Sequence, residues 1–338
     1  MNSFELIPTE ENLIHTLDKD LLKRNKDLVR FYDLILVQEG ASSIAIDGRW
    51  GSGKTFFVKQ SMLLINAKNP MSDMDDEKKA SIVYALPFPK KAEDMPENYD
   101  VAVYYDAWEN DNGTDPVLSL VYEIIKQLGI NYAFDDNSNA FKLAGSVLEA
   151  LTGRNINGII ENLKSDNPLT KIKEEKDLHE NIKNFFTELL VERGNRLVVF
   201  IDELDRCKPS YAVQLLERIK HYLYDDRITF VFSVNLGELQ HTIKHYYGNT
   251  FDACRYLDRF FDMRISLPPA DKTAFYREMG LESSYVLEKI CRKVIDTYNM
   301  ELREATRFYR QVKTAAYEPT HESRKFDFSF SDEKNECS

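Results

Sequence analysis

The stretch GRWGSGKT, at residues 48–55, lies between two apolar runs, SSIAID before it and FFVKQSMLLI after it. Its glycines let the backbone curl with the N–H groups pointing inward, and Lys54 and Thr55 then begin an expected helix. Such a loop suits a polyphosphate, because the amides face anionic oxygens, Lys54 reaches the outer phosphates and the Thr55 hydroxyl ligates Mg²⁺. An ordinary glycine-rich turn between strand and helix is the alternative. The candidate nucleotide-binding residues here are Gly48, Arg49, Trp50, Gly51, Ser52, Gly53, Lys54, Thr55 and Phe56.

A second candidate group ends the apolar strand RLVVFID at 196–202. Asp202, at the carboxyl end of that strand, is placed to hold Mg²⁺ or its water shell together with Thr55. Glu203 follows directly and can orient and deprotonate an attacking water. A solvated acidic turn is the alternative, which the phosphate loop upstream disfavours. The two motifs together predict an ATPase or GTPase site, and since no Asn-Lys-x-Asp guanine motif is present, ATP is the expected substrate.

Further residues with suitable chemistry follow later strands. Asn235 ends the strand FVFSVN, where its amide could position the water and sense the outer phosphate, or could cap the helix that follows. Phosphoryl transfer also favours a cation on the developing charge. Arg206, Arg255, Arg259 and Arg303 are candidates: Arg255 and Arg259 would act on a neighbouring subunit, and Arg303 would reach back from a lid. Each could instead be a surface arginine in water or in an ion pair.

These groups need an α/β scaffold that brings strand ends together. Apolar strands at 42–47, 101–108, 196–202, 228–235 and 260–269, each separated by helical patterns, are typical of a parallel sheet covered on both faces. SIVYALPFP, from residue 81, is expected to be a short strand or an extended arm after a polar loop. The predicted organisation is an N-terminal helical segment at 1–40, a P-loop core at 41–270 with a helical insertion at about 130–195, a helical lid at 271–318 and a polar tail at 319–338.

Composition limits the class of protein. The 338 residues include 43% hydrophobic and 30% charged residues, enough for a real core and a soluble surface. The net charge of −12 disfavours general nucleic-acid binding. Basic and aromatic residues alternate in RKVIDTYNMELREATRFYRQVK, and the outer face of an amphipathic helix is favoured over a nucleic-acid groove. The scattered cysteines, the absence of a signal-peptide pattern and the lack of a membrane-spanning apolar run favour a cytoplasmic protein.

Four stretches together resemble the KAP family of P-loop ATPases: IDGRWGSGKTFFV, VYYDAWENDNGTDPVLSLVYEI, FIDELDRCKP and YLDRFFDMRISLPP. The resemblance covers roughly residues 10–316 and implies an AAA-like fold of the acid-base P-loop type with a small helical lid. The chain departs from the family at two points. Many members carry transmembrane helices where this chain has a charged insertion, and the family often has Asp-Asp at the positions of Asp202 and Glu203.

Family members occur in bacterial conflict systems, including phage defence, usually with an effector encoded nearby. The resemblance therefore implies a Mg²⁺-dependent regulatory or assembly ATPase that self-associates and acts with a separate effector in anti-phage defence. A nucleotide-gated protein-binding module with little hydrolysis is the main alternative. A small-molecule kinase is disfavoured because nothing in the sequence marks an acceptor site. The trigger, the partner and the oligomer number are not encoded in any recognisable pattern.

Overall fold

The computed structural model describes residues 7–88, 99–112, 116–128, 193–222, 225–281 and 285–316, together with a few positions between 184 and 190. Most of the predicted insertion at 130–195 and the predicted tail at 319–338 lie outside the described residues. Within the described part, no helix is both long enough and apolar enough to cross a membrane.

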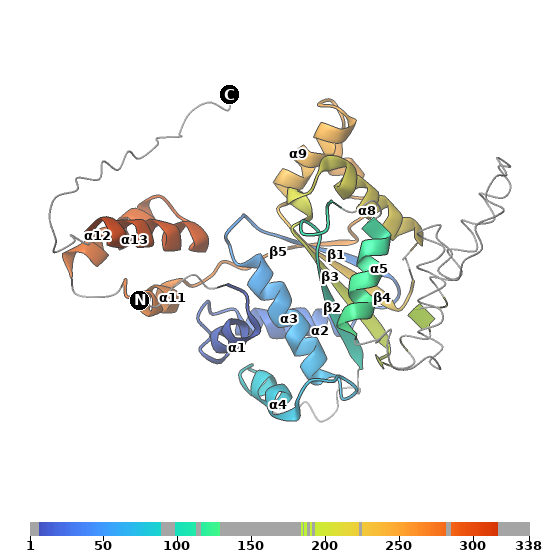
Figure 1. The fold of residues 1–338 in the computed structure, drawn as a ribbon, viewed down its shortest axis with the longest axis horizontal. Helices are drawn as coiled ribbons and strands as arrows, with labels where there is room; N and C mark the ends of the chain where they lie inside the picture. The colour runs from blue at the N-terminus through green and yellow to red at the C-terminus, as the bar shows by residue number, and fades with distance from the viewer. Residues whose placement is uncertain are drawn as a thin grey trace.

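A five-stranded parallel sheet forms the centre of the molecule (Figure 1), in the order β2-β3-β4-β1-β5. The strand bounds are β1 Ser42–Asp47, β2 Asp100–Asp106, β3 Arg196–Asp202, β4 Ile228–Val234 and β5 Met263–Ser266. β4 therefore separates the strand that leads into the phosphate loop from the strand that ends in Asp202. This confirms the predicted α/β class of P-loop fold.

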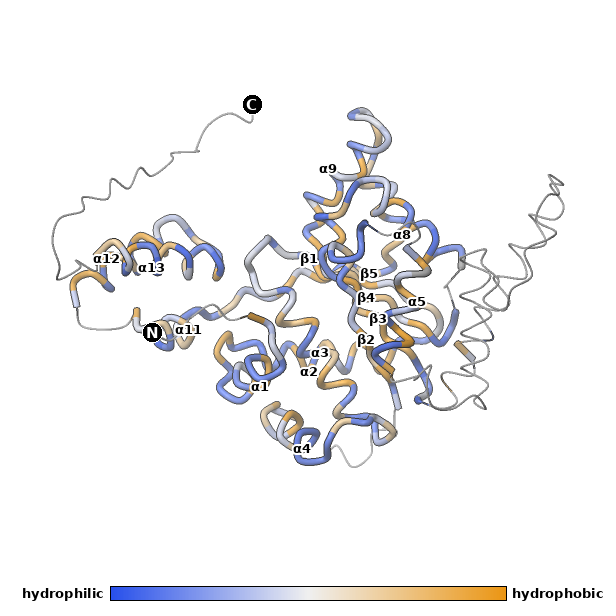
Figure 2. Tube along the Cα trace, in the orientation of Figure 1, coloured by the Kyte–Doolittle hydropathy of each residue, from blue (hydrophilic) through white to orange (hydrophobic). Residues whose placement is uncertain are grey.

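Helices cover both faces of the sheet because successive side chains of a strand point to opposite sides. Val198 and Phe200 of β3 pack with one helical layer, and Val199 and Ile201 pack with the other. The first layer contains α1 Glu10–Asp18, α2 Asn25–Leu36, α3 Lys54–Lys68 and α4 Asp76–Tyr84. The second contains α5 Pro116–Gln127, α8 Pro209–Tyr222, α9 Leu236–Tyr247 and α10 Ala253–Leu257. Figure 2 shows the hydrophobic residues concentrated in the strands between these layers.

The expectation of a strand or extended arm at SIVYALPFP was wrong, since residues 81–84 belong to α4. Asp75 caps this helix by accepting hydrogen bonds from the amides of Glu77 and Lys78. The polar residues before Ser81 therefore start a helix, whose buried Ile82 packs on the first layer. Capping by Asp is a local signal that outweighs the β-branched composition of a short segment.

The C-terminal helices form a separate group beyond β5 (Figure 1). They are α11 Thr273–Glu278, α12 Val286–Thr297 and α13 Leu302–Ala316. Their buried side chains, including Phe275, Ile295 and Tyr309, make a cluster distinct from the two sheet layers. Leu22, from the segment between α1 and α2, packs against this cluster. We call residues 273–316 the lid.

Candidate functional site

The phosphate loop joins β1 to α3 at the carboxyl edge of the sheet. The amide of Gly48 donates to the carbonyl of Val234 at 3.1 Å, which fixes the loop to the end of β4. Gly51 and Gly53 have φ values of 81° and 91°, in the left-handed region that glycine adopts without strain. Gly53 is the N-cap residue of α3, so the N-terminal amides of this helix open into the loop.

Lys54 folds back on the loop that precedes it. Its ammonium donates to the carbonyls of Gly48 at 2.6 Å and Arg49 at 3.2 Å. Burial lowers the pKa of Lys54, while the nearby carboxylates of Asp205, Asp202 and Glu203 oppose that shift. The loop and the acidic strand end are thus close enough to interact electrostatically.

Asp202 and Glu203 occupy the predicted position at the end of β3. Asp202 is fully buried, and its carboxylate accepts hydrogen bonds from the Tyr104 hydroxyl and the Glu203 amide, both at 3.0 Å. Glu203 has a left-handed backbone, with φ 61°, and begins a 3₁₀ turn, η2 Leu204–Arg206. Burial and then the charge of Asp202 raise the pKa of Glu203 to about 7. Asp106, at the end of β2, is the strand neighbour of Asp202.

Hard oxygen ligands for Mg²⁺ are available at this edge. Thr55, at the start of α3, offers a hydroxyl and Asp202 a buried carboxylate, which is the donor set Mg²⁺ prefers when phosphates complete its shell. The buried Ser52 hydroxyl oxygen, inside the loop, has no hydrogen-bond partner among the described residues. A buried hydroxyl oxygen without a hydrogen-bond partner is consistent with a site in which a bound group supplies that partner.

Tryptophans from two segments surround the turn after β3. The indole N–H of Trp50 donates to Asp205 at 2.5 Å. The guanidinium carbon of Arg206 lies 5.7 Å from the ring centroid of Trp50 and 5.7 Å from that of Trp108. The same guanidinium pairs with Glu203, with 2.5 Å between Nε and Oε2. Of the candidate arginines, Arg206 is the one that the structure brings to the proposed base.

Arg24, to which sequence reasoning gave no role, clamps the phosphate loop from the first helical layer. Its Nη1 donates to the Ser52 carbonyl at 2.9 Å, and its Nε and Nη2 donate to the Pro268 carbonyl at 2.9 and 2.6 Å. The residue is only 5% exposed, and burial lowers its pKa to about 10. These partners lie 28 and 244 residues along the chain, so no local pattern reveals them.

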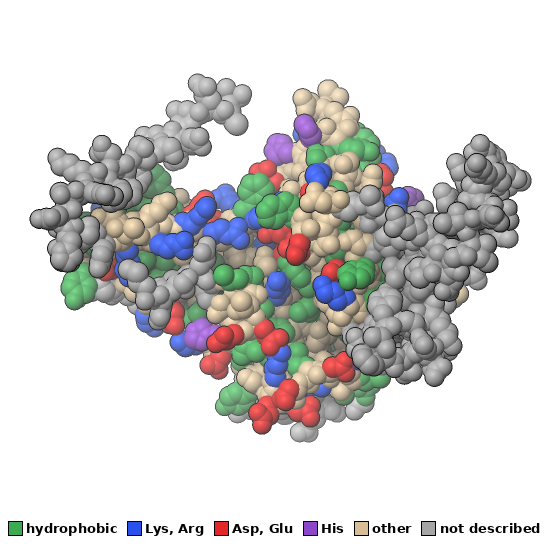
Figure 3. Space-filling model, viewed as in Figure 1, with side chains coloured by type: hydrophobic (Ala, Val, Ile, Leu, Met, Phe, Trp, Pro, Cys, Tyr) green, Lys and Arg blue, Asp and Glu red, His purple; other side chains and the backbone are tan. Residues whose placement is uncertain are grey.

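The lid reaches the loop at the start of α13. A β-carbon placed on Gly51 would lie 3.2 Å from the Cβ of Arg303 and 3.4 Å from the Cβ of Glu301. The amide of Asp271 donates to the carbonyl of Leu22 at 3.1 Å, which ties the segment before the lid to the N-terminal segment. Figure 3 shows Lys and Arg side chains gathered on the part of the lid that faces the core. Arg303 thus lies beside the phosphate loop, and its predicted reach over the nucleotide as a lid residue stays a prediction.

Asn235, Arg255 and Arg259 have other surroundings. Asn235 is the N-cap residue of α9 and accepts a hydrogen bond from the Glu238 amide at 3.4 Å, the capping alternative of the sequence analysis. Arg255 lies on α10 and Arg259 just after it, both exposed. This segment leads into β5 beside the start of β1, at the edge of the sheet opposite to the phosphate loop. Their predicted action on a neighbouring subunit stays a prediction.

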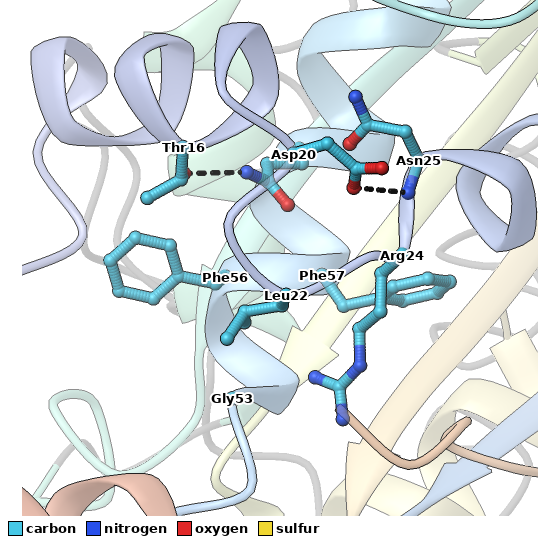
Figure 4. Close-up of a pocket in the computed structure, with 9 residues that line it drawn as sticks. Thr16, Asp20, Leu22, Arg24, Asn25, Gly53, Phe56 and Phe57 are labelled. Atoms are coloured by element: carbon cyan, nitrogen blue, oxygen red, sulfur yellow. Dashed lines mark hydrogen bonds between the residues drawn. The ribbon is translucent and has the colours of Figure 1, made fainter. Parts of the chain in front are cut away.

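A small, partly open pocket adjoins the loop at Gly53 (Figure 4). Within it, Gln60 donates to the Thr16 hydroxyl at 2.8 Å, and the Asn25 amide donates to Asp20 at 3.1 Å. The lining residues are Thr16, Asp20, Leu22, Arg24, Asn25, Gly53, Phe56, Phe57 and Gln60. The pocket offers aromatic and apolar surface together with polar groups next to the phosphate loop.

Comparison with known proteins agrees with this geometry. A relative from Methanocaldococcus jannaschii, described as "Uncharacterized protein MJ0182", is 33% identical over 95 residues, which cover 25% of this chain and 49% of that protein. The chain therefore spans about half the length of the curated relative that it matches. The model of the KAP family P-loop domain matches residues 25–318, a range that contains the phosphate loop, the acidic strand end and the lid. With a five-stranded parallel sheet, a glycine loop at its carboxyl edge and this match, the chain belongs to the KAP family of P-loop NTPases and carries its nucleotide-binding domain.

Proposed function

We propose that the protein is a Mg²⁺-dependent ATPase that uses Glu203 as the general base. One observation carries this proposal: the phosphate loop and the acids that end β3 face the same space at the carboxyl edge of the sheet. Lys54 interacts electrostatically with Asp202 and Glu203, and the indole N–H of Trp50 in the loop donates a hydrogen bond to Asp205. A site for binding and a group for cleavage are therefore adjacent.

Each group has a distinct role in the proposed hydrolysis. The loop amides and the N-terminus of α3 hold the phosphates, and Lys54 turns from its own loop carbonyls to the outer phosphate oxygens. Glu203 takes the proton of the attacking water. Mg²⁺ held by Thr55 and Asp202 would neutralise negative charge on the phosphates. Arg303 lies beside Gly51, from where it can contact the phosphates as charge develops.

The direct test is phosphate release from Mg²⁺-ATP, measured at several protein concentrations. We expect release by the wild-type chain, background release by Lys54→Ala, and release at least a hundredfold lower for Glu203→Gln with ATP binding retained. Specific activity that rises with concentration supports self-association, with Arg255 or Arg259 acting between subunits. Activity that stays constant contradicts the assembly role. Equal release by wild type and Lys54→Ala contradicts the ATPase proposal.

A second candidate function is a nucleotide-gated binding module with little hydrolysis. The ion pair of Glu203 with Arg206 favours it, since the positive charge of Arg206 opposes the rise in the pKa of Glu203 and so makes this carboxylate a weaker base. The two functions differ in what Glu203→Gln does. In a binding module, Glu203→Gln and wild type would perform equally in the cell, whereas an ATPase would lose its function.

For the cellular role we propose anti-phage defence as a regulatory or assembly ATPase that acts with a separate effector protein in the cytoplasm. Family membership supports this part of the proposal. The test is the plating efficiency of phages on cells that carry the complete locus, with Lys54→Ala as the matched control. Equal plating on wild-type and Lys54→Ala cells would contradict the defence role.

A further inference from the structure

Both tryptophans of the chain lie against one arginine. The sequence contains two tryptophans, Trp50 and Trp108, and each ring centroid is 5.7 Å from the guanidinium carbon of Arg206. Trp50 comes from the phosphate loop and Trp108 from the segment after β2, so two distant parts of the chain converge on the turn after β3. A cation over an aromatic face is attracted by the ring electrons, most strongly for tryptophan.

These rings are not part of the hydrophobic core. Trp50 is 44% exposed and Trp108 is 53% exposed, although burial would be the ordinary place for so large an apolar surface. In contrast, Tyr105, near the end of β2 and three residues before Trp108, is almost fully buried. The contact that these two rings share is the one with Arg206.

Arg206 in turn sets the direction of the Glu203 side chain. Its Nε lies 2.5 Å from Oε2 of Glu203, and both side chains are mostly buried, with exposed fractions of 23% and 15%. The Arg206 amide also donates to the Glu203 carbonyl at 3.1 Å, which closes the turn between them. A pair at one carboxylate oxygen restricts the rotation of the group, and so restricts where Oε1 points.

A counter-charge is needed here because three acids are crowded at this strand end. Asp202 precedes Glu203 and Asp205 follows two positions later, with each of these aspartates at most 5% exposed. Like charges at this spacing repel, and a carboxylate without a partner would turn away from its neighbours. The rings of Trp50 and Trp108 hold the Arg206 guanidinium next to Glu203, where its positive charge opposes this repulsion.

We propose that Arg206 is the positioning residue of the hydrolytic base: the stack of Trp50, Arg206 and Trp108 holds the guanidinium against Glu203 and so directs the carboxylate. The inference rests on the proposed function, because it takes Glu203 as the base. Trp50 belongs to the phosphate loop and is bonded to Asp205, so the loop that binds the phosphates also supports the group that aims the base.

The stack itself is tested in the full-length chain without nucleotide, by acrylamide quenching of tryptophan fluorescence. The two tryptophans at this site give all of the indole emission. We expect the quenching constant to rise about twofold in Arg206→Gln, because both rings lose the group that covers one face. Arg206→Lys keeps the charge without the planar group and should quench almost like Arg206→Gln. Arg30→Gln, which removes the ion pair of Arg30 with Asp27, also between residues three apart, should match wild type.

The positioning role is tested by steady-state kinetics with Mg²⁺-ATP. For Arg206→Gln we expect kcat to fall at least tenfold while KM for ATP stays within about twofold, since the base is misdirected but the loop still binds. Trp108→Leu should lower kcat several-fold with KM unchanged, and Trp108→Phe should restore most of it. Each kcat is calculated per mole of protein that binds nucleotide. A variant that only loses folded protein would therefore keep the wild-type kcat.

The outcomes separate this inference from the proposed function. If wild type releases no more phosphate than Lys54→Ala, the proposed function fails and the positioning role fails with it. If wild type is active and Arg206→Gln has an unchanged or higher kcat, the positioning role alone is overturned. An unchanged quenching constant in Arg206→Gln overturns the stack on which it depends.

Discussion

Arg24 and Arg206 both contact the phosphate loop, and their partners differ in kind. Arg24 donates to main-chain carbonyls of Ser52 and Pro268 and is almost fully buried. Arg206 faces a carboxylate and two half-exposed indole rings. The first arginine ties backbone segments together, and the second directs a side chain that can do chemistry. Of two arginines that contact one loop, Arg24 thus stabilises its backbone and Arg206 positions a side chain beside it.

Because of this difference, the two sides of the loop should respond differently to substitution. A buried cation on neutral carbonyls leaves several polar groups without partners when it is removed, so the effect should appear in the free energy of unfolding. A cation that is 23% exposed can be replaced by water at its carboxylate partner, so its effect should appear mainly in turnover. Three substitutions test whether the two sides of the loop differ in this way.

Arg24→Ala should have the largest effect on stability. It strips the Ser52 and Pro268 carbonyls of their donor inside the protein, and we expect a loss of about 3 kcal/mol in the free energy of unfolding. Chemical denaturation of wild type and variant measures it. Arg30→Ala, on the exposed side of α2, is the matched control and should stay within about 0.5 kcal/mol of wild type. Equal losses for both arginines would contradict a clamp at Arg24.

Gly53→Ala should come next, at about 2 kcal/mol, since a left-handed backbone disfavours any side chain. The new β-carbon would also lie 3.1 Å from Nη1 of Arg24. Combining the two substitutions in a double-mutant cycle isolates this contact. Gly53→Ala should cost less in the Arg24→Ala chain than in wild type. Strict additivity would show that the loop does not sense Arg24.

Trp50→Phe should have the smallest effect of the three. It keeps an aromatic ring beside Arg206 but removes the N–H that donates to Asp205, at a cost of about 1.5 kcal/mol for a hydrogen bond to a buried carboxylate. The matched control is Trp108→Phe, which is expected to change the free energy of unfolding by less than about 0.5 kcal/mol because that ring is more exposed. Similar losses for both substitutions would contradict a specific role of the Trp50 indole.

The parts of the site that sequence analysis predicted are those whose chemistry is local in the chain. The phosphate loop and the pair Asp202 and Glu203 each occupy consecutive positions next to an apolar strand, and the structure places both at one edge of the sheet. Arg24 could not be found this way, because hydrogen bonds to main-chain carbonyls require no particular side chain at the partner residues. The order of the strands is not set by any local pattern, since it depends on pairing between segments far apart in the chain. The helix at α4 was missed because its cap was read as part of a loop.

The roles of the arginines were open in the sequence for a physical reason. An arginine in a polar segment is compatible with water, an ion pair or an aromatic face, and only the fold selects among these. The structure selects the last two for Arg206, whose ring partners lie far from it in sequence. For Arg255 and Arg259 it shows exposed positions on and just after α10, in the segment that leads into β5.

The closeness of Gly51 to the first residues of α13 has a thermodynamic consequence. A β-carbon on Gly51 would lie only 3.2 Å from the Cβ of Arg303, so the loop and the lid are in close contact at this point. A change in the shape of the loop therefore affects the position of the lid. Whatever molecule prefers one lid position must therefore alter the affinity for nucleotide, and nucleotide must alter the affinity for that molecule by the same factor. A molecule that binds the lid and never contacts the phosphates would in this way bind with an affinity that depends on whether nucleotide is present.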